Sequence, residues 1–388
     1  MGTKLQASAA TLDDFGGHEG CNEILNVTRP DIVSSVHEAY LEAGVDCVTT
    51  NTFGANLSNL GEYGIAERID ELSEAGARIA RIARTAADRW SAPRRPRWVL
   101  GSVGPGTKLP TLGHVTLAEL RDAYQRNAAG LLRGGVDAIV VETCQDLLHA
   151  KAAIIGIRRA FTAAGIQIPL IAQVTIETTG SMLLGSEIGA ALTALEPLGI
   201  TLIGLNCATG PGEMSEHLRY LAGHSRIPLS CMPNAGLPML TSDGASYPLT
   251  PDQLADAHEM FTAEFGLALA GGVLRNHTPW PWPGGAAEPH PSTWRRWWNA
   301  CAAVGWPSAG RGPSPVWPPS TSTCRSARTP RSWPSASGPT RTDRRRSVRR
   351  SSLLATTTAW RSRVRRPAMA RTFSTCVWTT WAAAARPI

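Results

Sequence analysis

The stretch "DAIVVETC" (137–144) decides the fold, because a run of apolar, β-branched residues leads directly into a carboxylate and a hydroxyl. Such a run is typical of a strand buried on both faces of a parallel sheet. Comparable runs are "DCVTTNTF" (46–53), "RWVLGSVGP" (97–105), "IPLIAQVTI" (168–176), "ITLIGLNCA" (200–208), "IPLSCMPNAG" (227–236) and "FGLALAGG" (265–272). The sequence therefore predicts seven buried parallel strands.

Amphipathic helical patterns lie between these runs. In "RPDIVSSVHEAYLEAG" (29–44), Pro30 suits the first helical position and Gly44 the end. One face of this helix is apolar: Ile32, Val33, Val36, Tyr40 and Leu41. Further helices are predicted over 63–90, 117–133, 147–164, 186–197, 212–223 and 251–263.

Strand–helix alternation over residues 1–272 predicts an α/β fold, a (β/α)8 TIM barrel. Only seven strands are visible and the chain opens at "MGTKLQ" (1–6), so we expect a truncated first strand. A doubly wound open sheet is the alternative, because it requires no closing strand.

Charge divides the chain into two unlike parts. Residues 273–388 hold 19 Arg, no Lys and only Glu288 and Asp343 as acids, a net charge of +17. The part before them has 19 basic and 29 acidic residues, a net charge of −10. Eleven of the 13 Trp also follow Gly272. The composition therefore predicts a mildly acidic domain over 1–272 and an Arg/Trp/Pro/Ser-rich tail that is disordered.

The sequence also bears on location. It has no apolar stretch long enough to span a bilayer and no signal-peptide pattern at its start. Its eight Cys are scattered without the even spacings of a disulfide framework. We therefore expect a cytoplasmic protein with no membrane partner.

Polar residues follow the predicted strands, where the chemistry of a barrel is located. They are Thr50, Asn51, Thr52, Glu142, Thr143, Asn206, Cys207 and Asn234. Each has a structural alternative: a strand-end Cys as a small buried hydrophobe, Glu142 as a helix cap and Asn234 as a turn residue. "GSVGPG" (101–106) lacks the Lys-Ser/Thr of a phosphate-binding loop and is interpreted as a turn.

Four stretches in this order resemble the homocysteine-binding barrel of the cobalamin-dependent methionine synthases. They are "GGHEGCNEILNVTRPDIVSSVHEAYLEAGVDCVTTNTFGAN" (16–56), "VVETCQD" (140–146), "GLNCATGP" (204–211) and "MPNAGLP" (232–238). The likeness runs from about Met1 to Gly272. It implies methyl transfer to homocysteine. The donor would be methylcobalamin, ultimately 5-methyltetrahydrofolate, and both would be bound by other modules of a full-length enzyme.

The resemblance implies a Zn²⁺ site in which three Cys thiolates leave a fourth position for the homocysteine sulfur, which zinc keeps as the nucleophilic thiolate. Cys207 matches the first of these ligands. An adjacent Cys pair is expected after the last strand, but "GGVLRNHT" (271–278) stands there, and His277 and His290 are poor substitutes. The sequence therefore predicts that zinc binding is weak or lost and that this chain is inactive.

The resemblance also implies the substrate contacts. Glu142 would hold the amino group of homocysteine, and Thr52, Asn206 and Asn234 are further substrate-binding candidates. An Asp expected in a D-G-A-M-G-T segment on the first strand is absent, because this chain reads "MGT" (1–3).

The missing Cys pair has an explanation in the genetic code. Val273–Pro279 can be encoded so that reading one base later gives C-C-G-T-T-P. Gly285–Pro291 can give the same string from its third base. Ser335–Arg349 can read I-G-E-R-T-N-A-N-G-S-K-A-F-R-E one base earlier, which resembles the opening of the folate-binding module. We therefore predict that 273–388 is out-of-frame translation of the barrel end, the linker and the start of that module.

Other functions stay open at this point. Arg clusters such as "RTDRRRSVRR" (341–350) suit phosphate backbones, but no recognisable nucleic-acid fold accompanies them, so no nucleic-acid partner is expected. A cobalamin-independent homocysteine S-methyltransferase, which uses betaine or S-methylmethionine, is one alternative. A non-catalytic barrel fragment that only binds is the other.

Overall fold

A computed structural model describes residues 1–6, 8–90, 96–237, 239–241, 244–246 and 248–271, and the backbone of 376–378. All of these belong to one unit of the chain, Met1–Pro307 with Thr372–Ile388. Apart from the backbone of 376–378, the predicted out-of-frame, disordered tail lies outside the described residues. So do His277, His290 and the predicted domain boundary after Gly272.

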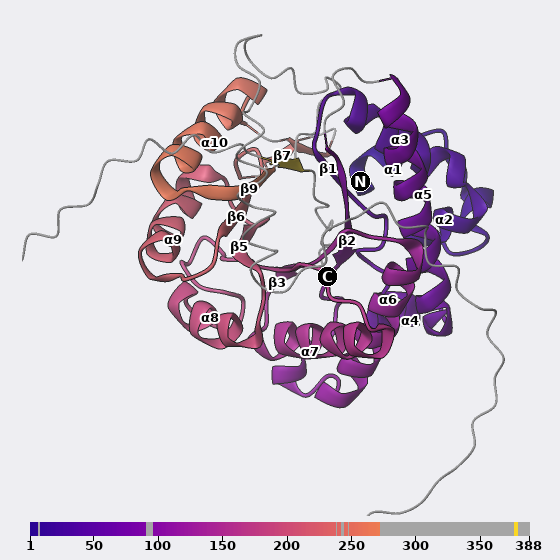
Figure 1. Cartoon of the computed structure of the whole chain (residues 1–388), viewed down its shortest axis with the longest axis horizontal. Helices are drawn as coiled ribbons and strands as arrows, with labels where there is room; N and C mark the ends of the chain where they lie inside the picture. Colours follow the sequence, from indigo (N-terminus) through magenta and orange to yellow (C-terminus); the bar gives the residue numbers. More distant parts are fainter. Residues whose placement is uncertain are drawn as a thin grey trace, which may run out of the picture. The chain divides into compact units, whose positions relative to one another are not determined.

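Seven parallel strands form a curled sheet, and each lies within one of the apolar runs that predict it (Figure 1). They are β1 (Cys47–Thr49), β2 (Trp98–Val103), β3 (Ala138–Cys144), β4 (Leu170–Val174), β5 (Leu202–Asn206), β6 (Leu229–Met232) and β9 (Leu267–Gly271). Strands pair in chain order, and a short strand β10 (Cys376–Trp378) pairs in parallel with β9. An antiparallel hairpin of β7 (Met239–Thr241) and β8 (Gly244–Ser246) stands apart from this sheet.

Helices surround the outside of the sheet in Figure 1. They are α1 (Gly2–Gln6), α2 (Leu25–Thr28), α3 (Pro30–Glu42), α4 (Leu57–Glu62), α5 (Ile69–Trp90), α6 (Leu117–Gly134), α7 (Leu147–Ala164), α8 (Ile188–Leu195), α9 (Pro211–His224) and α10 (Pro251–Phe265). A doubly wound sheet would change its strand order at a switch point and carry helices on both faces. The sequential order and the outer helices instead confirm the predicted α/β barrel architecture. Within the ranges that the structure describes, every helix is too short or too polar to cross a bilayer.

Local sequence explains most helix limits. Pro30 begins α3, which buries Ile32, Val33, Val36 and Leu41 of its predicted apolar face and half-buries Tyr40. The predicted helix over 63–90 is wrong at its start, because Gly64 takes a left-handed conformation with φ 72° and α5 begins only at Ile69. Where we expected the remnant of a first strand, residues 2–6 form α1 instead.

The core has two layers, one on each face of the sheet. Between the sheet and the helices lies a large apolar cluster that includes Ile139, Val141, Ile203 and Leu131. The alternate residues of the strands form a second cluster on the other face: Cys47, Leu100, Ala138, Val140, Ile171, Leu202, Met232 and Leu269. This alternation follows from the two-residue period of a strand. It fixes which residues each strand presents at its carboxyl end.

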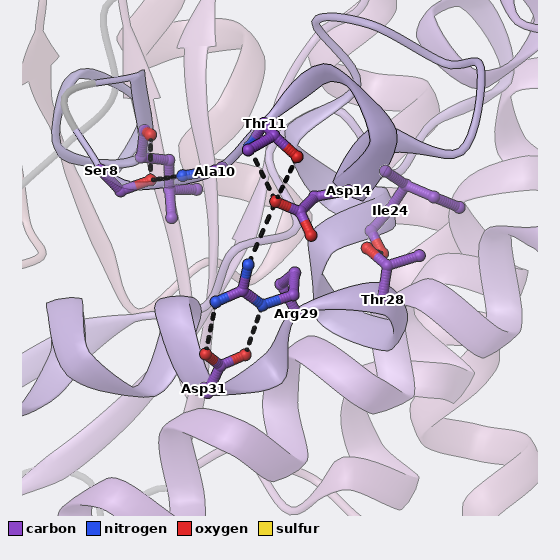
Figure 2. Close-up of polar contacts among 9 residues, drawn as sticks. Ser8, Ala10, Thr11, Asp14, Ile24, Thr28, Arg29 and Asp31 are labelled. Atoms are coloured by element: carbon purple, nitrogen blue, oxygen red, sulfur yellow. Dashed lines mark hydrogen bonds and ion pairs between the residues drawn. The ribbon is translucent and has the colours of Figure 1, made fainter.

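Arg29 attaches the N-terminal segment to the start of α3, as Figure 2 shows. Its guanidinium donates two hydrogen bonds to the Asp31 carboxylate, at 2.9 and 2.7 Å, and one to Asp14 at 3.1 Å. The same Asp14 oxygen accepts from the backbone N–H and the hydroxyl of Thr11. Hydrogen bonds from Thr11 and Arg29 hold the pKa of Asp14 below its usual value. The segment is thereby fixed beside the helix that precedes β1.

Candidate functional site

The predicted site residues gather at the carboxyl edge of the sheet, and all of them are buried. Glu142 lies within β3 and Asn206 ends β5, directly before Cys207. Thr52 follows β1, and Asn234 follows β6. Because the strands are parallel and neighbouring, their carboxyl ends converge on one edge.

Glu142 faces a small cavity. It is 1% exposed, and its Oε1 accepts a hydrogen bond of 2.6 Å from the Ser102 hydroxyl. Its Oε2 has no hydrogen-bond partner among the described residues. Burial raises the pKa of Glu142 to about 7, although the Ser102 hydrogen bond and the nearby Met1 amine favour the charged form. One carboxylate oxygen is thus available for a ligand. The cavity is lined by Met1, Glu23, Thr49, Thr50, Asn51, Phe53, Ser102 and Glu142.

Thr52 contacts two residues that line this cavity, Ser102 and Thr50. Its hydroxyl donates to the Ser102 carbonyl at 2.7 Å and lies 2.6 Å from the Thr50 hydroxyl, which accepts from the Ser102 N–H at 3.0 Å. Since Thr52 donates its one hydroxyl proton to Ser102, the proton between the two threonines comes from Thr50. The three residues form a closed ring of hydrogen bonds that joins the end of β1 to β2 and orients Ser102 toward Glu142.

Asn206 holds Thr143 and Cys207 together. Its Oδ1 accepts from the Thr143 N–H at 2.8 Å, and its Nδ2 donates to Thr143 Oγ1 at 2.8 Å and to Cys207 Sγ at 3.3 Å. Thr143 Oγ1 lies 3.7 Å from the same sulfur. Either atom of this last contact can be the donor. The sulfur therefore lies beside one assigned donor, the Asn206 amide.

The backbone is strained at the same place. Thr143 and Cys207 each have φ 58°, and Ala208 has φ 55°, in the left-handed region that L-residues rarely adopt. Each such residue costs about 1–3 kcal/mol and persists only where the surroundings impose it, often at functional sites. Asn206 Oδ1 holds the Thr143 N–H, and backbone hydrogen bonds from the Cys207 N–H to Met232 and from the Thr209 N–H to Cys207 hold the second loop.

Asn234 lies beside this loop. It is 4% exposed, and its backbone N–H donates to the Thr209 carbonyl at 3.0 Å. Its Oδ1 has no hydrogen-bond partner in the described part of the chain. The Cys207 N–H donates to the Met232 carbonyl at 3.1 Å, which joins the ends of β5 and β6. The edge thus carries a second available oxygen near the Cys207 loop.

Sequence reasoning missed Glu23, a second carboxylate of the cavity. Glu23 is 7% exposed and accepts the Gly54 N–H at 2.7 Å. Burial raises its pKa, and the hydrogen bond from Gly54 opposes this rise. Sequence reasoning looked for site residues at strand ends, and no predicted strand directly precedes Glu23. The one sequence signal for Glu23 was its position within "GCNEILN" (20–26), part of a stretch that carries the family resemblance. Ser102, inside β2, was missed as well, because its role depends on its hydrogen bond with Glu142, 40 residues further along the chain.

The described residues do not by themselves fit a zinc site. They contain no group of three His, Cys, Asp or Glu side chains placed to hold a metal ion. Cys207 has Thr143 and Asn206 beside its sulfur. Cys231 instead contacts the Met214 sulfur at 3.8 Å, in the layer between sheet and helices. One thiol is fewer than a structural zinc ion requires.

Comparisons with known proteins agree with this architecture. The family model described as homocysteine S-methyltransferase matches residues 1–274. The chain is 66% identical over 272 residues to a methionine synthase of Mycobacterium tuberculosis and 63% identical over 272 residues to one of Mycobacterium leprae. These matches cover 70% of this chain but only 23% and 22% of those relatives.

Solved structures show the same fold. The metallated form of the homocysteine methyltransferase MmuM from Escherichia coli aligns with a TM-score of 0.57 at 22% identity, over 72% of this chain and 90% of that one. Its oxidised form aligns with a TM-score of 0.55 at 21% identity, over 72% and 90%. The overall fold of the matched part is thus shared with a solved protein.

Proposed function

Because the chain belongs to the homocysteine S-methyltransferase family, we propose that it is the homocysteine-binding module of a cobalamin-dependent methionine synthase. The observation that carries the proposal is the 66% identity to a methionine synthase across the whole matched region. The site geometry also supports the proposal, because Thr143, which follows Glu142 in β3, contacts the Cys207 sulfur at the carboxyl edge of the sheet. The match covers less than a quarter of the length of those relatives. That the other modules of such an enzyme accompany this one is therefore part of what we propose.

Glu142 would bind the ammonium group of homocysteine. Its free Oε2 can accept a charge-assisted hydrogen bond, and in a buried site such bonds are strong. An ammonium ion beside Glu142 also offsets the cost of burying the ionised carboxylate. With the amine held there, the substrate thiol would lie along the edge toward Thr143 and Cys207. Asn234 Oδ1 and Asn206 remain candidate contacts on that side, and Thr52 would act through Ser102.

In the proposed reaction the homocysteine thiolate would form a bond to the methyl carbon while the bond between that carbon and its carrier breaks, and the carrier would leave with that electron pair. We propose methylcobalamin as the donor and 5-methyltetrahydrofolate as its source, each bound by another module of a full-length enzyme. No step is assigned to zinc, because Cys207 is the one described thiol that matches the expected ligand set and the described residues hold no group of three possible ligands. The described chain's own part is to bind the amino acid, orient its sulfur and exclude water from the cavity. The cytoplasm remains the predicted location.

We further propose that this chain holds zinc weakly and does not transfer methyl groups. Cys207 is the one described residue that matches the expected ligand set, and the sequence lacks the expected Cys pair after the last strand. Metal analysis of the purified chain after dialysis against a mild chelator should find well below one equivalent of zinc. Retention of one equivalent would contradict this part of the proposal.

Calorimetric titration with homocysteine tests the binding function. The full chain should bind homocysteine, and Glu142→Gln should weaken binding about tenfold to a hundredfold, as expected for a buried charged hydrogen bond. Glu259→Gln makes the same chemical change on the exposed face of α10 and should leave binding unchanged. Equal affinity of the Glu142→Gln variant and the unaltered chain would refute the assigned role.

A further inference from the structure

Glu23 and Glu142 approach the same cavity from different elements. Glu142 comes from β3, and Glu23 comes from the short helical turn η2 (Asn22–Ile24), which precedes α2. Both side chains are more than nine-tenths buried and both line the cavity. Two carboxylates that are remote in sequence therefore share one enclosed space.

Each of these carboxylates has one oxygen that accepts a short hydrogen bond from the protein and one that accepts a weak hydrogen bond or none. Glu142 Oε1 accepts from Ser102, and Oε2 has no hydrogen-bond partner in the described ranges. Glu23 Oε1 accepts from the Gly54 N–H, and the contact of its Oε2 is a weak one with Cys21 Sγ at 4.0 Å. The fixed oxygens set the orientation of both groups, and both side chains line the same cavity.

The close approach of Gly54 holds the Glu23 carboxylate in place. A Cβ added at Gly54 would lie 2.8 Å from both carboxylate oxygens of Glu23, nearer than real Cβ atoms come. A side chain at this position would therefore have to displace the Glu23 carboxylate from its present place. The Gly54 N–H thus holds the Glu23 carboxylate, which the short turn η2 carries into the cavity.

The charge of the cavity selects a cation. Its lining contains no Lys, Arg or His side chain among the described residues. The one basic group there is the Met1 amine: burial lowers its pKa to about 6, and Glu142 opposes that change. Buried carboxylates are costly without a partner, so the cavity favours a compact ligand with several N–H donors. A primary ammonium, with three donors, meets this requirement.

We propose that Glu23 is a second binding residue for the substrate ammonium, which is held between Glu23 and Glu142 so that the site selects amino thiols over thiols without an amine. This inference rests on the proposed function. The ammonium would donate to Oε2 of each carboxylate. Both groups are then ionised and paired, and the substrate is anchored at its amino end.

Two ligands and a charge-neutral variant test the assignment. Homocysteine and 4-mercaptobutanoate, which is homocysteine without its amino group, are titrated calorimetrically into the full chain. The unaltered chain should prefer homocysteine by about a hundredfold, since two charged hydrogen bonds are lost with the analogue. Glu23→Gln should weaken homocysteine about tenfold and leave 4-mercaptobutanoate unchanged, so that the preference falls to about tenfold. Glu259→Gln serves as the exposed control.

The outcomes separate the two claims. If Glu23→Gln weakens both ligands equally, Glu23 only shapes the cavity, and the assignment is overturned while the proposed function stands. If the unaltered chain fails to bind homocysteine, both are overturned. Should Glu23→Gln fail to fold by circular dichroism, Glu23→Asp keeps the charge but withdraws it by one methylene. That variant should reduce the preference for the amine, and an unchanged preference would equally overturn the assignment.

Discussion

Replacing Glu142 by Gln should change the pH dependence of folding stability. Burial raises the pKa of Glu142 to about 7 from 4.5, so the folded chain binds this proton more tightly than the unfolded chain. The free energy of unfolding therefore falls as the pH rises from 4.5 to about 7. At about 1.4 kcal/mol for each pH unit, the loss is about 3 kcal/mol above pH 7. Glutamine does not ionise and avoids this loss.

Urea denaturation of the full chain measures the effect. Near pH 5 the Glu142→Gln variant should have about the stability of the unaltered chain. Near pH 8 it should be more stable by about 3 kcal/mol. Glu259→Gln, on the exposed face of α10, corrects for the loss of one negative charge.

The result that refutes the reasoning is a difference in stability that is the same at both pH values. It would mean that Glu142 is solvated or paired in the free chain, so that its ionisation carries no cost. Saturating homocysteine provides an internal check. If an ammonium pairs with the carboxylate, the substrate should restore stability near pH 8 in the unaltered chain more than in the variant.

Three other substitutions are expected to act through contacts already described. Thr143→Val removes the hydroxyl that meets Asn206 and should cost about 1–3 kcal/mol in denaturant unfolding, whereas Thr143→Ser should cost less; equal losses would contradict the role of the hydroxyl. Gly204→Ala would drive a methyl group into the Ser230 carbonyl and should cost about 3 kcal/mol, and a neutral result would disprove the tight pairing of β5 and β6. Tyr124→Phe removes a buried hydroxyl that contacts the Gly104 carbonyl and the His149 ring, and it should lower the free energy of unfolding by about 1–3 kcal/mol. An unchanged melting temperature would count against a stabilising role for these two hydrogen bonds.

The strands were predictable because their signal is local. Residues 138–141 are apolar and mostly β-branched, and β3 forms over Ala138–Cys144 with almost every residue buried. Glu142 and Cys207 could likewise be predicted as edge residues, since a parallel sheet delivers every strand end to the same side. The limits of α5 could not be placed as well, because the break at Gly64 interrupts an otherwise continuous helical pattern.

The cavity could not be derived from the sequence, because it is formed by contacts between residues that are far apart in the chain. Glu23 meets Gly54 across 31 positions of chain, and no periodic pattern records such a contact. The left-handed backbone of Thr143 is equally hidden, because a β-branched residue ordinarily favours extended conformations. Its cause is the side chain of Asn206, 63 residues further along the chain. Contacts over such separations appear only once the sheet is formed.

The contact between Gly54 and Glu23 has a consequence for how this module can vary. Since any side chain at position 54 would collide with the carboxylate, the two positions are not free to mutate independently. In a combinatorial library of both codons, alanine at 54 should survive selection for binding only beside a shorter acid at 23. Homologous genes should show the same covariation, a signature that can be sought without any measurement on the protein.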